Sequence, residues 1–290
     1  MDLDVLFEPS SRDTAPASLA AASHIQKHSK SQLMLILPSD HYIPDMALFQ
    51  KVVSAGIEVA EKGGFVTFGI KPTKPETGFG YININKGPGP VLSVAAFHEK
   101  PIKQDAEYFV SQDDYLWNSG IFLVNVEWYL NFARSLRAAM VADVTEALSL
   151  AEPTKELEGK LLEPTRWSKL EKISIDRAFV EKCRSVYCIP FEGEWSDLGG
   201  WRSLFDLQKP DQYGNRLYGS SLTVQCKNTL LWSESGAPTL VGLGVSNIFA
   251  VATGSGILIS ELDHAQNVGA ISNILNQNNL HVIDDPNRIE

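Results

Sequence analysis

The 290-residue sequence has only three cysteines, no long apolar run and a shortage of positive charge. Cys183, Cys188 and Cys226 are odd in number and lack CxxC spacing, which argues against both a disulfide framework and a zinc site. We therefore expect reduced thiols packed as small apolar groups. No apolar stretch approaches the roughly 18 residues of a membrane span, and the N-terminus lacks the basic-then-apolar pattern of a signal peptide. These absences predict a cytoplasmic protein with no membrane partner.

Acidic residues outnumber basic residues by 35 to 25, which gives a formal net charge of -10. Proteins bind nucleic acids and anionic membrane surfaces through a basic face, so we expect neither as a partner, although a local basic pocket is compatible with the composition. With 44% hydrophobic residues, the chain can bury one large core or two modest ones.

The first half of the chain has the pattern of an α/β sheet. Residues 13–29 predict a helix that Asp13 or Thr14 can cap, and the apolar run at residues 33–37 predicts a strand buried on both faces, as in a parallel sheet. Helical spacing over residues 45–62 and a strand over residues 65–70 complete a βαβ unit.

Two strand-like runs on either side of residues 86–90 predict an antiparallel hairpin, and Ser174 is the expected N-cap of a short helix. After about residue 210 the pattern changes to short β-rich runs at close, regular spacing, broken by Gly, Ser and Asn. We therefore predict an α/β domain over residues 1–210 and a small β-rich domain over residues 211–290, for which a solenoid-like stack is one arrangement.

Two aspartates are candidates for a metal site. Asp40 follows the strand at residues 33–37, and open α/β sheets bind ligands beyond the carboxyl ends of their strands, although Asp40 could instead cap a turn. Asp197 lies between two tryptophans and precedes Gly199 and Gly200, a pair that costs conformational entropy unless something must approach the backbone closely. If the fold brings both carboxylates together, they can hold magnesium with substrate phosphates and water; the alternative is a loop pinned in a core by its tryptophans.

Other polar residues near predicted strand ends suit a sugar phosphate. Gly80 precedes a strand and leaves backbone amides open to the hydroxyls of a ligand, while Glu99 and Lys100 offer an acceptor and a cationic donor at the end of another strand. The amide of Asn118 can both donate to and accept from a vicinal diol. The alternatives are a plain loop at Gly80 and a solvated surface pair at Glu99 and Lys100.

Seven segments in order along the chain resemble the nucleotidyltransferases that make sugar nucleotides. They are most similar to the bacterial mannose-1-phosphate guanylyltransferase family, also called GDP-mannose pyrophosphorylases. The segments are EPSSRDTAPA, LPSDHYI, GIKPTKPETGFGYI, FHEKP, YLWNSGIFLVN, SIDRAFVEK and WSDLGGW. Each is weak alone, but seven in family order extend the resemblance over nearly the whole chain.

The resemblance implies an α/β fold with a Rossmann-like, GT-A-like mixed sheet, truncated at its N-terminus, and a β-rich C-terminal domain that could be a left-handed β-helix. It implies attack by mannose 1-phosphate on the α-phosphorus of GTP, giving GDP-mannose and pyrophosphate for polysaccharide biosynthesis. Asp40 and Asp197 match the catalytic, Mg²⁺-binding aspartates. The substrate-binding positions match Gly80, Glu99, Lys100, Asn118 and Asp176, and the nucleotide-binding positions match Glu8, Arg12, Thr14 and Ala15.

Two departures from the family pattern matter for activity. Asp13 stands where the family usually has Asn, and the family's opening strand and loop of the type G-x-G-x-R-L-W-P, which cradles the triphosphate, have no counterpart here. We expect low activity from this chain alone, and self-association or a partner chain that supplies the segment. Three functions stay open: this guanylyltransferase, a silent sugar-phosphate-binding or regulatory subunit, and a nucleotidyltransferase for another hexose 1-phosphate or another NTP.

Overall fold

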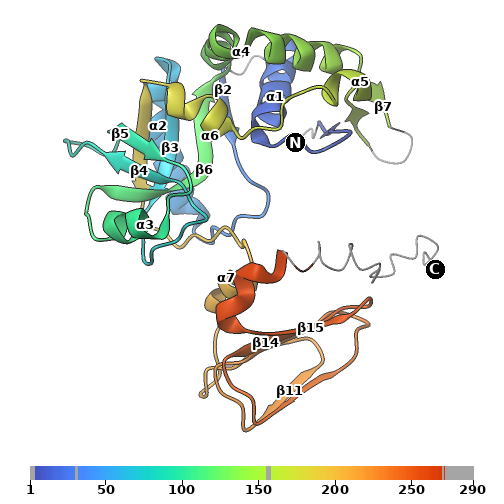
Figure 1. Ribbon diagram of the computed structural model, residues 1–290. Coiled ribbons are helices and arrows are strands. Elements are labelled where there is room, and N and C mark those ends of the chain that lie inside the picture. The colour runs from blue at the N-terminus through green and yellow to red at the C-terminus, as the bar shows by residue number, and fades with distance from the viewer. Residues whose placement is uncertain (1–3, 30–31, 155–157, 270, 272–290) are drawn as a thin grey trace. The chain divides into compact units, whose positions relative to one another are not determined.

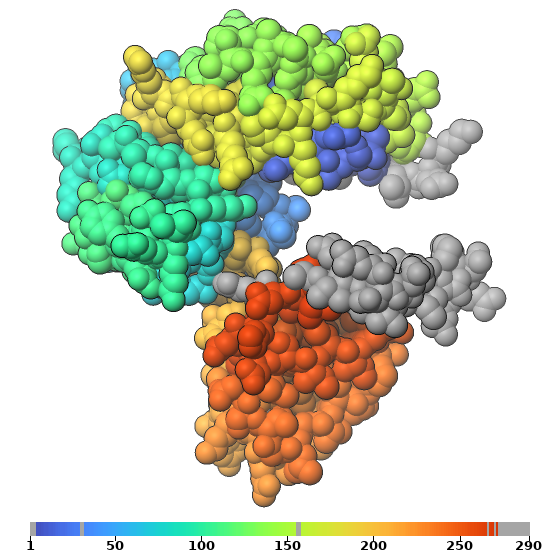
Figure 2. Space-filling view, viewed as in Figure 1, coloured from blue at the N-terminus to red at the C-terminus, as the bar shows by residue number. Residues whose placement is uncertain are grey.

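The computed structural model describes residues 4–29, 32–154, 158–269 and 271 (Figure 1). Contacts divide the chain into two units. Unit 1 comprises Met1–Ser39 and Ile43–Trp195, and unit 2 comprises Asp40–Tyr42 and Ser196–Glu290. Figure 2 shows the surface of unit 1 mainly in blue to yellow and that of unit 2 mainly in orange to red.

A six-stranded mixed sheet forms the centre of unit 1, in the order β2-β6-β3-β9-β5-β4, with β6 also pairing with β4. Both β2 and β3 run antiparallel to β6, which lies between them, whereas β3 and β9 are parallel. The strands are β2 (Leu33–Ile36), β3 (Phe65–Ile70), β4 (Tyr81–Ile84), β5 (Leu92–His98), β6 (Tyr115–Asn125) and β9 (Val186–Phe191).

The strand expected to be buried on both faces of a parallel sheet, β2, is instead an edge strand that pairs antiparallel with β6. Only Met34 of its four residues is fully buried, because the strand has a neighbour on one side only. All six residues of β3 are buried, since β3 has β6 on one side and β9 on the other. The hairpin of β4 and β5 is confirmed as antiparallel.

Helices cover both faces of this sheet because successive strand residues point to opposite sides. Val66 and Phe68 pack in the cluster of α2 (Met46–Glu61), while Phe65 packs in the cluster of α1 (Thr14–His28) and α4 (Val126–Ser149). Figure 1 shows α1 beside α4, which also contact each other extensively. Asp13 caps α1 through the Thr14 amide, and the predicted first helix is confirmed.

The remaining elements of unit 1 are short. They are β1 (Leu6–Phe7), α3 (Lys103–Val110), β7 (Glu152–Pro153), β8 (Lys160–Leu161), α5 (Pro164–Trp167), α6 (Ile175–Ala178) and a 3₁₀ turn at Val180–Lys182. Ser174 caps α6 as predicted, its hydroxyl accepting from the Arg177 amide. All three cysteines are free thiols, with Cys188 and Cys226 buried. No helix among the described residues could cross a membrane.

Unit 2 is rich in strands and stacks them in parallel, as the solenoid prediction requires. β10 (Arg216–Tyr218), β12 (Leu230–Ser233) and β14 (Ile248–Ala252) pair in parallel, as do β11 (Ser221–Val224) and β13 (Leu240–Leu243), and β15 (Ile257–Glu261) closes the larger sheet antiparallel to β14. A 3₁₀ segment, Leu262–Asn267, follows.

The observed division between the units differs from the predicted boundary at residues 210 and 211. Helix α7 (Trp201–Leu207) belongs to unit 2 because Phe205 is buried with Phe249, and Trp201 stacks on Phe249 at 6.1 Å between ring centroids. The aromatic side chains of α7 therefore complete the core of the strand-rich unit, and the helix lies within the stretch of unit 2 that resumes at Ser196.

Candidate functional site

An irregularity in the central sheet positions Asn118. Thr67 of β3 pairs with Phe122 of β6, whereas Gly69 pairs with Asn118, so three residues of β6 lie opposite one residue of β3. Gly120, within this stretch, has φ of 71°, a left-handed conformation that glycine adopts without strain. Bulges of this kind re-aim a side chain at a strand's edge, and here they turn the Asn118 amide toward α6.

The hydrogen bonds of Asn118 determine which way its amide faces. Its Oδ1 accepts from the Gly120 amide at 3.2 Å and from the Thr67 hydroxyl at 3.0 Å, and its Nδ2 donates to Asp176 Oδ1 at 2.8 Å. A backbone N–H can only donate, so Oδ1 must be the atom beside Gly120. Two protein donors already occupy this oxygen, so the N–H groups are the part of the amide that faces away from them; how Asn118 meets a diol stays a prediction.

Two carboxyl groups lie beside this amide. Burial raises the pKa of Asp176 to about 7, and the nearby Glu99 carboxylate adds to the rise. Burial likewise raises the pKa of Glu99, against the lowering effect of Lys100, whose Nζ is 4.0 Å from Glu99 Oε1. Because burial and mutual repulsion disfavour the charged forms of both carboxyl groups, hydrogen bonds from neutral donors such as sugar hydroxyls are favourable here.

Gly80 and Glu99 are in close approach. A Cβ added to Gly80 would lie 2.7 Å from Glu99 Oε2, and the Gly80 carbonyl accepts from the backbone N–H of Asn118 at 2.8 Å. The structure thus brings together four predicted residues, Gly80, Glu99, Asn118 and Asp176, with the exposed Lys100 at the rim. Arg177 lies near this group as well, because its charge lowers the pKa of Glu99. The sequence did not indicate Arg177 as a site residue, although it follows Asp176 directly.

The predicted nucleotide segment is tied to the loop before Asp176. The Arg12 guanidinium donates to the Ser168 carbonyl, the Thr14 hydroxyl accepts from the Ile175 amide at 2.9 Å, and the buried Ala15 donates its amide to the Ile173 carbonyl at 3.1 Å. Burial raises the pKa of Glu8, against the lowering by the Arg12 backbone amide.

Asp13, which departs from the family pattern, has a left-handed φ of 67°, and its charge contributes to the raised pKa of Glu99. It accepts from the Thr14 amide at 2.8 Å. The N-terminal segment and the carboxyl cluster are therefore neighbours within unit 1.

The two candidate metal carboxylates both belong to unit 2 and are held by an isolated β-bridge. Tyr42 and Ser196 exchange two backbone hydrogen bonds of 2.8 Å and 3.1 Å, which sets Asp40 and Asp197 on adjoining segments. Burial lowers the pKa of His41, while the carboxylates of both aspartates raise it. Both carboxylates therefore interact electrostatically with the same imidazole.

Local backbone geometry explains the glycine beside Asp197. A Cβ on Gly199 would overlap the Asp197 carboxylate, and Leu198, between them, has a left-handed φ of 48°. The bare backbone therefore makes room for the aspartate itself. Strained turns of this type persist where the surrounding structure holds them, often at functional sites.

The donor set suits a hard divalent cation that keeps ligands from elsewhere. Across the described residues, no cluster of three or more His, Cys, Asp or Glu side chains can hold a metal. Asp40 and Asp197 supply two carboxylates, and magnesium is bound by one or two carboxylates with phosphates and water completing its shell. The residues present therefore fit this ion.

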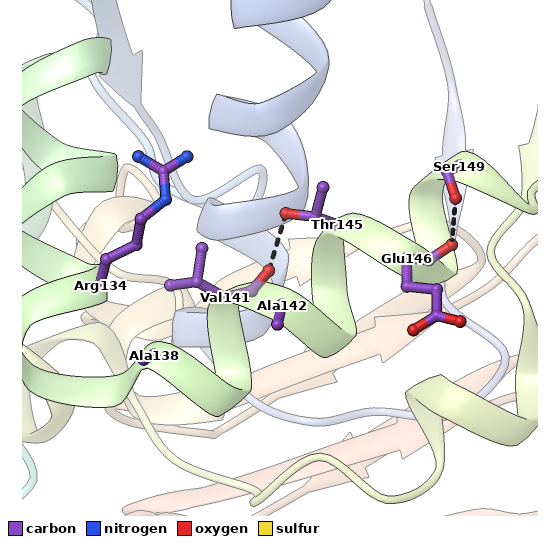
Figure 3. A pocket seen from close by; sticks show the side chains of 7 residues that line it. All are labelled: Arg134, Ala138, Val141, Ala142, Thr145, Glu146 and Ser149. Atoms are coloured by element: carbon purple, nitrogen blue, oxygen red, sulfur yellow. Dashed lines mark hydrogen bonds between the residues drawn. The ribbon is translucent and has the colours of Figure 1, made fainter.

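A hollow along α4 contains none of the predicted site residues (Figure 3). It is lined by Arg134, Ala138, Val141, Ala142, Thr145, Glu146 and Ser149. The Thr145 and Ser149 hydroxyls donate to the Val141 and Glu146 carbonyls of the same helix, so the polar groups of the hollow already have partners.

Comparisons with known proteins agree with the sequence pattern. A family model described as nucleotidyl transferase matches residues 1–213. The Xanthan biosynthesis protein XanB of Xanthomonas campestris is 35% identical over 91% of this chain and 55% of its own length. A mannose-1-phosphate guanylyltransferase of Escherichia coli is 34% identical over 92% of this chain and 58% of its own, and the alginate biosynthesis protein AlgA of Pseudomonas putida is 33% identical over 91% and 54%.

Solved structures show the same likeness. A crystal structure from Thermus thermophilus, described as a mannose-1-phosphate geranyltransferase, superposes with a TM-score of 0.81 at 26% identity, over 93% of this chain and 77% of that one. A Helicobacter pylori protein described as a mannose-6-phosphate isomerase gives 0.59 at 29% identity, over 67% and 73%. The chain spans about half the length of the curated relatives it matches.

Proposed function

The chain belongs to the nucleotidyl transferase family, and from this membership we propose that it is a mannose-1-phosphate guanylyltransferase. The reaction transfers the GMP moiety of GTP to mannose 1-phosphate: a phosphate oxygen of the sugar attacks the α-phosphorus, and the bond to the leaving pyrophosphate breaks. No covalent enzyme intermediate is needed. Relatives of that name, at about one-third identity over most of this chain, support the substrate assignment.

The observation that carries the proposal is the cluster of Asn118, Asp176 and Glu99. Two carboxyls and an amide N–H within one neighbourhood recognise hydroxyl groups, and the adjoining Lys100 and Arg177 supply positive charge for a phosphate. A hydroxyl can donate to a carboxylate while it accepts from the amide. A sugar phosphate matches this combination better than a nucleobase or a purely apolar ligand.

Asp40 and Asp197 are the residues we assign to Mg²⁺. The ion would offset the negative charge that the two phosphates bring together. The Tyr42–Ser196 bridge fixes the spacing of the two segments before any ligand arrives, so little reorganisation accompanies binding. Glu8, Arg12, Thr14 and Ala15 are assigned to the guanine end of GTP. The hydrogen bonds of Arg12, Thr14 and Ala15 to residues 168–175 give that segment a defined shape.

Three further parts of the assignment stay predictions. One is a cytoplasmic location, another is a homo-oligomer, and the third is a partner chain that supplies the Gly-rich triphosphate loop. Sedimentation at increasing concentration would test the oligomer, and a stable monomer at high concentration would count against it.

The test is Mg²⁺-dependent pyrophosphate release from GTP and mannose 1-phosphate. It compares the wild-type chain with Asp197→Asn, each with and without a co-expressed segment carrying the Gly-rich loop. We expect release that Asp197→Asn lowers by about 100-fold or more, because one charge-stabilising group is lost. Lys209→Ala, a surface change outside the assigned positions, is the control and should leave release unchanged. A folded chain that binds mannose 1-phosphate but releases no pyrophosphate in any combination would contradict the enzyme assignment.

A further inference from the structure

A buried hydroxyl lies directly behind the sugar-recognition cluster. Thr67, in the middle of β3, is fully shielded from solvent on a strand whose six residues are all buried. Burying a hydroxyl is unfavourable unless it forms hydrogen bonds. Here the Thr67 hydroxyl lies 3.0 Å from Asn118 Oδ1 and 3.0 Å from the Ile121 carbonyl oxygen, so one proton serves two acceptors.

Both acceptors lie on the irregular stretch of β6. Where three residues of β6 face one residue of β3, regular strand pairing cannot satisfy every polar group. Thr67 bridges the gap, and with the Gly120 amide it saturates the oxygen of Asn118. The amide nitrogen then faces the opposite direction, with one N–H on Asp176 and a second N–H that no bond among the described residues engages.

We propose that Thr67 is a positioning residue that locks the Asn118 amide with its N–H groups toward the ligand. The Asn118 amide then offers the ligand one N–H, beside two carboxyl groups, and no acceptor. It selects a ligand hydroxyl that accepts from Asn118 and donates to Asp176 or Glu99. Identifying that ligand as mannose 1-phosphate rests on the proposed function, whereas the locking of Asn118 rests on geometry alone.

The test compares two substitutions that differ by one hydroxyl. Thr67→Val keeps the shape and removes the donor, and Thr67→Ser keeps the donor. Thr229→Val is the matched control, because Thr229 is equally buried and its hydroxyl donates to the Lys227 carbonyl at 3.0 Å in unit 2. Circular dichroism and thermal melting establish that each variant is folded.

The first measurement is calorimetric binding of mannose 1-phosphate. We expect Thr67→Val to weaken binding by about tenfold, the effect of one lost hydrogen bond and a freed acceptor, and Thr67→Ser to restore most of it. Where turnover is measurable, KM for the sugar phosphate should rise while kcat stays within about twofold, since the bond acts equally in ground and transition states. Thr229→Val should bind as wild type does.

The second measurement is independent of any substrate. The side-chain amide NMR signals of Asn118, assigned by their loss in Asn118→Asp, should shift and exchange faster with solvent in Thr67→Val but not in Thr67→Ser. Unchanged Asn118 signals in Thr67→Val, or equal effects of Val and Ser, would overturn the positioning role. Wild-type protein that fails to bind mannose 1-phosphate, yet loses the Asn118 lock in Thr67→Val, would refute the ligand assignment and leave the positioning role standing.

Discussion

Substituting Gly80 by alanine tests whether the close approach of Gly80 and Glu99 serves ligand binding. The added Cβ would lie 2.7 Å from Glu99 Oε2 and 3.2 Å from the Phe97 ring, so the carboxylate must retreat by about 0.7 Å to reach ordinary contact. The φ angle of Gly80 lies outside the left-handed region, so alanine adds no backbone strain there.

Stability and affinity should respond differently to this change. Overpacking costs about 1–3 kcal/mol, with the low end expected because the nearest atom is the far end of a side chain, and about 0.4–1 kcal/mol returns from the stiffer unfolded chain. We therefore expect the free energy of unfolding to fall by no more than about 1–2 kcal/mol. A displaced charged acceptor, in contrast, should raise the dissociation constant for mannose 1-phosphate by about 10- to 100-fold.

The assay pairs calorimetric titration with urea unfolding. Gly87→Ala is the control, since no atom lies within 4 Å of a Cβ added at Gly87 and its φ is likewise outside the left-handed region. It should leave the affinity unchanged and raise the free energy of unfolding by no more than about 0.4–1 kcal/mol, through the stiffer unfolded chain alone. Wild-type affinity in Gly80→Ala would refute the assignment of Glu99 to the ligand. Loss of more than about 3 kcal/mol of stability would show that the site is too rigid for the carboxylate to move.

Two further predictions concern stability. The pKa of Asp176 is raised from 3.8 to about 7 by burial and by Glu99, so the folded state holds a proton that the unfolded state releases, and stability falls as pH rises from about 4 to 7. Asp176→Asn should flatten that slope and stabilise the protein by roughly 2–4 kcal/mol at pH 8 but little at pH 4, measured by urea unfolding; an unchanged slope would count against a raised pKa. Gly219→Ala should destabilise unit 2 by roughly 3 kcal/mol or more, because its φ is 64° and a Cβ would overlap the Ser233 carbonyl. Gly236→Ala is the control: its φ is 81° but the space around it is open, so only the strain of the left-handed backbone should lower stability. Hydrogen exchange of β12 amides would report the difference, and equal protection in both variants would contradict it.

Local features of the fold could be predicted because they depend on neighbouring residues. Asp13 and Ser174 cap the predicted helices, and the β4–β5 hairpin lies where its Gly and Pro residues indicated. The pairing of β2 could not be predicted, since its partner β6 is contributed by residues 115–125 and an apolar run does not reveal strand direction. The division at Ser196 differs from the predicted boundary for the same reason, because Trp201 packs on Phe249, which lies far along the chain.

The sequence predicted which residues form the candidate site better than it predicted how their side chains are oriented. The residue pattern indicated Asn118 and Glu99, and the resemblance added Asp176. The three lie together, but their roles stay predictions that the experiments above test. The orientation of the Asn118 amide depends on an irregularity in β6 and on Thr67, which the pattern presented as one more strand residue. A buried residue that positions a site residue, without contacting the ligand itself, forms no recognisable sequence motif.

The Tyr42–Ser196 bridge limits how these units can be exchanged between proteins. Unit 2 is assembled from two separate stretches, so a single cut between Trp195 and Ser196 would leave Tyr42 on one fragment and its hydrogen-bonding partner on the other. A chimaera joined at that point would combine Asp40 of one parent with Asp197 of the other. Any graft meant to carry both aspartates intact must transplant residues 40–42 as well, through two additional junctions.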